Sequence, residues 1–229
     1  MTTTLQLRNG KKWLPVAISR LERHLSQLFV PVDDCDEDKT RALCKNIAYS
    51  IQHLQFIDRC GEDLAITSVI YTQNIKTFVI VGSSILEAAF WYLLVANGKA
   101  ARTEWKSENK TSTAFSMNGE LHKIDTEIFR KLEAPELESM TFDAMCKRVE
   151  RRELVKLTSE DFYQHLPYLR KLRNRVHIHG IEGLRDTDWI TFNRKEIELV
   201  KKVLYAFLQS SLFPAKNEEY FSFLSANAA

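Results

Sequence analysis

The chain has 229 residues, of which 45% are hydrophobic and 27% charged, a composition that excludes a disordered or fibrous protein. Its 32 basic and 30 acidic residues nearly cancel, so it lacks the charge excess of a protein that coats nucleic acid. An enzyme acting on RNA needs only a local basic patch and is not excluded. Seven glycines and five prolines leave few breaks, which favours long helices. We therefore expect an all-α protein whose single domain spans 1–229.

The four cysteines are widely spaced and form no C-x-x-C pair. Residues Met1–Gly10 also lack the apolar run of a secretory signal. We therefore expect reduced thiols and a cytoplasmic location.

Apolar residues at steps of three and four predict most of the helices. A first amphipathic helix is expected from Trp13 to Leu28, and a second from about Thr40 to Asp58. Further helices are predicted at Thr126–Leu132, at Phe142–Leu154, at Ser159–His165, from Pro167 to an end near His177 to Gly180, and from about Lys195 to Leu212.

The run from Phe78 to Ala96 is apolar on nearly every face and is long enough to cross a membrane. Glu87 lies near its middle, where an ionisable side chain is costly in a bilayer. The other predicted helices each have a polar face. The sequence therefore favours the buried central helix of a bundle over a membrane span, and no membrane partner is expected.

A polar stretch from Lys99 to Leu121 follows, rich in Lys, Ser, Thr and Asn. It is expected to lie on the surface as an insertion around 99–121. Asn118-Gly119 is the kind of dipeptide that turns a short β-hairpin within such a stretch.

The segment from Arg173 to His179 is the best candidate for chemistry. It brings His177 and His179 close in sequence to the guanidinium groups of Arg170, Arg173 and Arg175. Histidine can take up or release a proton near neutral pH, and arginine binds phosphate oxygens in two-point contact. This set suits cleavage of an RNA phosphodiester without a metal.

These residues resemble the HEPN (higher eukaryotes and prokaryotes nucleotide-binding) domains, all-α bundles in which an Arg is followed, after four to six residues, by a His. Arg173 and His179 have five residues between them, and the polar Asn174 after the Arg is typical of the family. Arg170 and His177, with six between, form an alternative pair.

The resemblance implies an all-α, HEPN-like helical bundle with an extra N-terminal helix and the polar insertion. It implies a metal-independent endoribonuclease, with no cofactor, that leaves a 2′,3′-cyclic phosphate. His179 would move protons, Arg173 would stabilise the phosphorane, and Asn174 would orient one of them, with His177 in reserve. Glu87 would either orient Arg173 or pair with another arginine for structure, and Arg170 and Arg175 would contact the substrate.

Family members usually act as dimers, and many are toxins or defence effectors. The resemblance therefore implies RNA as substrate, a homodimer, and an antitoxin or other regulatory protein as partner. The sequence leaves a second hypothesis open: a non-catalytic helical module that binds nucleotides or a protein, with these residues forming a solvated helix end.

Overall fold

The computed structural model describes residues 13–156, 161–177, 183 and 186–225. The contacts between residues divide the chain into two compact units, one of residues 1–98 with 142–229 and one of residues 99–141. The helical unit contains α1 (Ile18–Leu25), α2 (Glu37–Asp63), α3 (Ser68–Ala96), α4 (Phe142–Arg151), α5 (Asp161–Asn174), α6 (Asp188–Thr191), α7 (Arg194–Leu208) and a final 3₁₀ helix, η1 (Glu218–Leu224). A two-stranded hairpin has no hydrophobic core of its own, so this division does not make it a second domain. The single domain expected over 1–229 stays a prediction.

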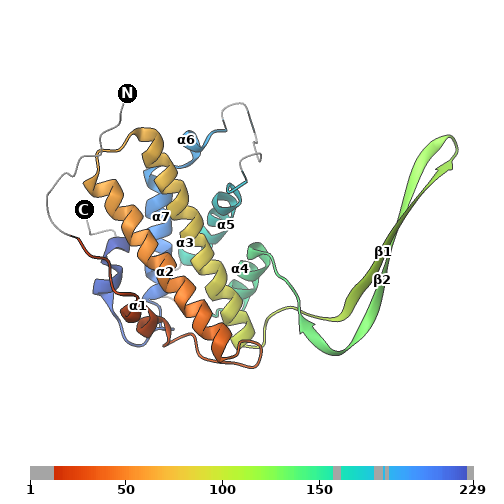
Figure 1. The fold of residues 1–229 in the computed structure, drawn as a ribbon, viewed down its shortest axis with the longest axis horizontal. Helices are drawn as coiled ribbons and strands as arrows, with labels where there is room; N and C mark the ends of the chain where they lie inside the picture. The colour runs from red at the N-terminus through yellow and green to blue at the C-terminus, as the bar shows by residue number, and fades with distance from the viewer. Residues whose placement is uncertain (1–12, 157–160, 178–182, 184–185, 226–229) are drawn as a thin grey trace. The chain divides into compact units, whose positions relative to one another are not determined.

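The long helix α3 is the centre of the helical unit. It runs beside α2 and also packs against α4, α5, α6 and α7 (Figure 1). It begins ten residues earlier than the sequence predicted, at Ser68 instead of Phe78. By length and composition α3 could cross a membrane, but 67% of its most apolar stretch is buried against the rest of the protein. This burial favours the core-helix interpretation.

Gly82 brings α3 and α7 into close contact. A Cβ atom at this position would lie 2.5 Å from Val200 Cγ1 and 3.0 Å from Leu204 Cδ1, closer than packed side chains approach. The missing side chain therefore sets the distance between the two helices.

Phe90 joins α3 to three other helices. Its fully buried ring lies 6.2 Å from that of Phe142 in α4 and 6.3 Å from those of Phe162 in α5 and Phe207 in α7. Aromatic side chains bury more apolar area than other residues, so this cluster contributes strongly to the core.

Helix α5 is continuous through Pro167, whereas the sequence predicted one helix over Ser159–His165 and another beginning at Pro167. That prediction is wrong. A proline inside a helix removes one backbone hydrogen bond and costs about 3 kcal/mol. Buried side chains at helical spacing on both sides of the proline offset this cost: Phe162, Leu166, Leu169 and Leu172.

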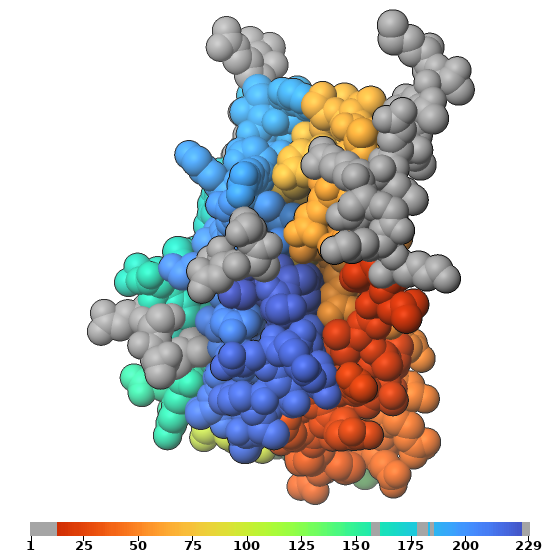
Figure 2. Space-filling model, turned by 90° about the vertical axis from the view of Figure 1, so that its left-hand side faces the viewer, coloured from red at the N-terminus to blue at the C-terminus, as the bar shows by residue number. Residues whose placement is uncertain are grey.

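The two ends of the described chain pack together (Figure 2). Gln27, just after α1, accepts a hydrogen bond from the backbone N–H of Ala215 at 2.6 Å and donates one to the carbonyl of that residue at 3.2 Å. Gln55 of α2 donates to the carbonyl of Tyr220 at 3.0 Å. Side-chain amides thus fix the C-terminal segment to α1 and α2.

His24 of α1 is buried in this contact between Phe213 and Phe221, with ring centroids 4.7 Å and 4.8 Å away. The amides of Asn217 and Gln27 donate to its Nδ1 at 3.0 Å and 3.3 Å, which requires a neutral ring. Burial lowers the pKa of His24 from its usual 6.5 to about 4.

Unfolding of the protein exposes His24 to water and restores its ordinary pKa. The unfolded chain therefore binds a proton at His24 more tightly than the folded protein does. The stability from this group is therefore complete above pH 6.5 and is lost as the pH falls toward 4. Between about pH 7.5 and pH 5 we expect the free energy of unfolding to fall by roughly 2 kcal/mol on this account. Urea unfolding at both pH values measures it. In His24→Gln, which stays neutral, the fall should be smaller by that amount; an equal fall in both proteins would contradict the assignment.

The second unit is a β-hairpin, so the expectation of an all-α fold is wrong. Strands β1 (Arg102–Met117) and β2 (Glu120–Leu137) form a two-stranded antiparallel sheet. Asn118 and Gly119 have φ of 55° and 80°, as a two-residue hairpin turn requires, which confirms the predicted turn. The polar insertion does not end at Leu121, and the helix predicted at Thr126–Leu132 is part of β2. Pairing with β1 overrides the local helix preference there.

The cysteines are free thiols, as expected from their spacing. Cys35, Cys44 and Cys146 are buried, and Cys60 is half-buried.

Candidate functional site

Arg173 in the last turn of α5 forms an ion pair with Glu87 of α3. Its Nη2 donates to Glu87 Oε2 at 2.8 Å, joining residues 86 positions apart. The Arg173 side chain is 32% exposed and that of Glu87 is 24% exposed. The guanidinium is therefore fixed in direction but still open to solvent. Of the partners that the sequence allowed for Glu87, the structure selects Arg173.

Arg175, just after α5, is held by the segment that follows. Its Nη1 donates to Asp186 Oδ2 at 2.5 Å, its Nη2 also contacts that carboxylate, and Nη2 donates to Thr191 Oγ1 of α6 at 2.8 Å. The side chains of Arg175 and Asp186 are only 14% and 17% exposed. This two-point contact supports a structural role for Arg175, and its predicted contact with substrate gains no support.

Arg170, one turn before Arg173 on α5, forms an ion pair with Asp143 at the start of α4. Lys147 and Arg170 together hold the pKa of Asp143 below its usual value. Arg170 thus ties α5 to α4, and about a third of its side chain is exposed. A phosphate contact by Arg170 stays a prediction.

The polar residues that follow Arg173 lie at the open end of α5. Asn174 is the last residue of the helix and is exposed, and His177 is exposed just beyond it. His179 lies outside the described residues.

A second cross-helix ion pair was not predicted from the sequence. The Lys76 ammonium of α3 donates to Asp188 Oδ2 of α6 at 2.8 Å, and Gln73 donates to the same oxygen at 3.3 Å. Burial alone would raise the pKa of Asp188, but these hydrogen bonds hold it below its usual value. A lysine on an otherwise apolar helix is the sequence signal that points to such an acidic partner.

Lys76 and Glu87 lie on the same side of α3, because eleven residues make three helical turns. They are therefore about 16 Å apart along the helix axis. Glu87 binds Arg173, and Lys76 binds Asp188. The chain between Arg173 and Asp188 contains both histidines. On this side of α3, Val79 and Ser83 between the two pairs are buried and Ile80 is half-buried, whereas the exposed Thr77 and Ser84 lie roughly a quarter turn away around the helix.

Comparisons with protein-family models, curated proteins and solved structures found no match to this chain. The HEPN resemblance therefore rests on the residues of this chain alone and stays a prediction.

Cysteine chemistry does not fit the site. Cys146 of α4 lies near Asp143, Arg170 and Glu87, but burial raises the pKa of its thiol to about 12. A thiol that stays protonated at neutral pH is a poor nucleophile. Within the described part of the chain, no three His, Cys, Asp or Glu side chains gather as metal ligands would.

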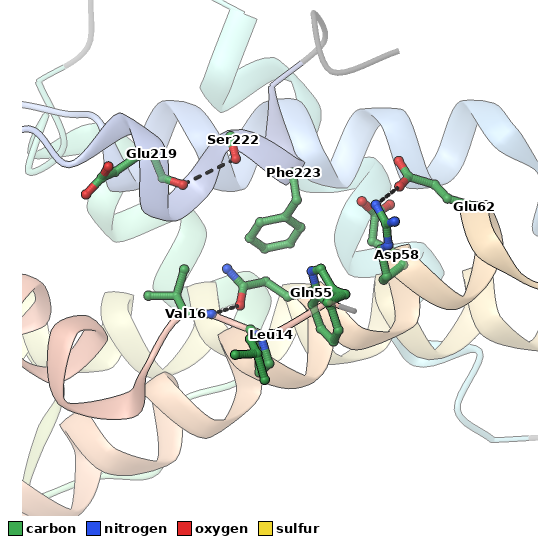
Figure 3. Close-up of a pocket in the computed structure, with 11 residues that line it drawn as sticks. Leu14, Val16, Gln55, Asp58, Glu62, Glu219, Ser222 and Phe223 are labelled. Carbon is green, nitrogen blue, oxygen red and sulfur yellow. Dashed lines mark hydrogen bonds and ion pairs between the residues drawn. The ribbon is translucent and has the colours of Figure 1, made fainter. Parts of the chain in front are cut away.

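A separate pocket of about 360 Å³ lies between the segment before α1, helix α2 and η1 (Figure 3). Asp58, Glu62 and Glu219 line it together with Arg59. Burial raises the pKa of Asp58, which forms an ion pair with Lys201 at 2.5 Å. Because carboxylates outnumber the cation on its wall, this pocket does not suit a phosphodiester.

Proposed function

We propose that this chain is a metal-independent endoribonuclease of the HEPN type, with Arg173 as the group that binds the scissile phosphate. The observation that carries the proposal is the ion pair with Glu87, which fixes a partly exposed guanidinium at the end of α5. An arginine held in this way loses little side-chain freedom when it binds phosphate.

The reaction needs two proton transfers and one charge stabiliser. The ribose 2′-oxygen attacks phosphorus and loses its proton to an imidazole, for which His179 is the first candidate and His177 the second. The bond from phosphorus to the 5′-oxygen breaks, and that oxygen takes up the proton that the imidazolium returns, which leaves the histidine neutral again. Arg173 stabilises the negative charge that gathers on the phosphorane, and Asn174 contributes a hydrogen bond. The products are a 2′,3′-cyclic phosphate and a free 5′-hydroxyl.

The position of the motif also supports this proposal. The chain from Arg173 to Asp188 is anchored to α3 at both ends, and Arg175 and Asp186 form a further contact within it. These three ion pairs fix the ends of the segment that contains the two histidines. RNA as substrate, a homodimer, a regulatory partner and a cytoplasmic location are parts of the same proposal.

The test uses purified full chain and end-labelled RNA in excess EDTA. We expect cleavage that leaves 2′,3′-cyclic phosphate ends. His179→Ala should abolish it, and His177→Ala should retain most of it; the reverse result would assign the proton transfers to His177. His53→Ala, in the exposed part of α2, is the control and should cleave like the natural protein.

Activity that EDTA removes, or that survives loss of both histidines, would refute the proposal. Unchanged RNA binding without any cleavage would instead favour the non-catalytic module.

A further inference from the structure

Next to its turn, the hairpin has one face on which most of the exposed apolar side chains gather. Partners across a two-stranded sheet point to the same side, and successive residues alternate. From the turn to Asn109, one face therefore carries Met117, Phe115, Ile124 and Ile128. Their exposed fractions lie between 37% and 55%, and the Phe115 ring stacks on His122 at 5.7 Å.

The opposite face over the same length is polar and internally paired apart from Leu121, and beyond the bulge near Asn109 it also carries the exposed rings of Trp105 and Phe129. Lys110 contacts Glu127 at 2.9 Å across the strands, and Lys123 contacts Asp125 at 2.9 Å along β2. Near the turn, the two faces thus differ as the buried and solvated faces of a larger sheet do.

A two-stranded hairpin is marginally stable in water, and an apolar face helps only when something covers it. The strands and turn carry six basic and seven acidic residues, with no basic cluster. This balance argues against nucleic acid or an anionic membrane as the covering surface, because both require an excess of Lys and Arg.

The apolar face is complementary to itself. Counted along β2 from Asp125, Glu120 lies five residues toward the turn and Arg130 five residues toward the other end, both on this face. His122 and Ile128 are likewise three residues to either side. A two-fold axis at the level of Asp125 would therefore place Glu120 of one copy against Arg130 of the other, which also pairs with Glu108 of its own hairpin at 2.6 Å, and near its cross-strand neighbour Lys106.

We propose that the apolar face of this hairpin binds the same face of a second copy of the chain, with the two hairpins antiparallel. The nine paired residues from Asn109 to Met117 span about 30 Å. Two such faces bury on the order of 1,000 Å² together, near the lower limit for specific interfaces, so the dimer is reversible. The proposal uses only the hairpin and does not depend on the proposed RNA cleavage.

Sedimentation velocity of the full chain from about 1 to 100 μM tests it, with a monomer–dimer equilibrium expected in the micromolar range. Ile124→Lys places a charge at the centre of the face and should weaken the dimer at least tenfold. Ser116→Lys is the matched control, because it places the same charge on the polar face of the same hairpin and should leave the dimer unchanged.

Charge reversal identifies the orientation. Glu120→Lys should weaken the dimer, and adding Lys106→Glu should restore much of it, because Lys106 lies beside Arg130, which faces position 120 across the two-fold axis. The unfolding midpoint of the helical unit should be the same in all variants.

A chain that stays monomeric at the highest concentration would overturn the proposal. So would a dimer that Ile124→Lys leaves intact, because that dimer forms through another surface.

Discussion

Replacing Arg173 by alanine is expected to lower the rate of RNA cleavage by about 10²- to 10³-fold, the effect of removing one donor that stabilises transition-state charge. The loss should fall mainly on kcat, because the negative charge on the phosphorane is greater than that on the bound phosphodiester. Steady-state kinetics on a short labelled RNA in EDTA measure it. Lys171→Ala changes an exposed cation on the same helix and should cost less than about threefold.

Glu87 is expected to act through Arg173, as a positioning residue. Glu87→Gln keeps an acceptor oxygen at the 2.8 Å contact but removes its charge. We expect about a tenfold loss of kcat with little change in KM, a loss that should largely vanish in the Arg173→Ala background. An Arg173→Ala protein as active as the natural one would sink the assignment of both residues.

Replacing Phe90 by alanine is expected to lower the free energy of unfolding by about 3–5 kcal/mol, the usual cost of truncating a buried aromatic side chain. The substitution removes the ring that α4, α5 and α7 share, each with its own aromatic contact at 6.2–6.3 Å. Because small domains are stable by only about 5–15 kcal/mol, this is a large fraction of the total.

Urea unfolding of Phe90→Ala and of a control variant, Phe56→Ala, measures this loss. Phe56→Ala on α2 is the matched control, because that side chain is 55% exposed, and its cost should stay within about 0.5 kcal/mol. Similar losses in the two variants would show that the cluster around Phe90 does not hold the four helices together.

The helices were predictable where one local pattern decided them. The apolar run ending at Ala96 predicted the central helix, and Asn118-Gly119 predicted the hairpin turn. The extent of β2 was not predictable, because its residues 126–131 form a strand by pairing with residues 105–111, more than ten positions away. The helix break predicted at Pro167 was wrong for a related reason. The packing of α5 on its neighbours keeps the helix continuous, and this packing cannot be deduced from the residues next to the proline.

The candidate site was predictable in its residues but only partly in its contacts. Arg173 and Glu87 were both singled out from the sequence, yet their pairing joins two helices and was one of two alternatives. The contact of Arg175 with Asp186 and that of Lys76 with Asp188 were not foreseen, because an ion pair between distant segments leaves no periodic signal. Sequence thus identified the chemical groups, and the fold decided which of them are already engaged.

The close approach of α3 and α7 at Gly82 limits how the sequence of this protein can evolve. Any larger residue at position 82 would push α7 away unless Val200 became smaller in the same lineage. Relatives of this chain should therefore show correlated exchange at these two positions, with bulk gained on one helix matched by bulk lost on the other.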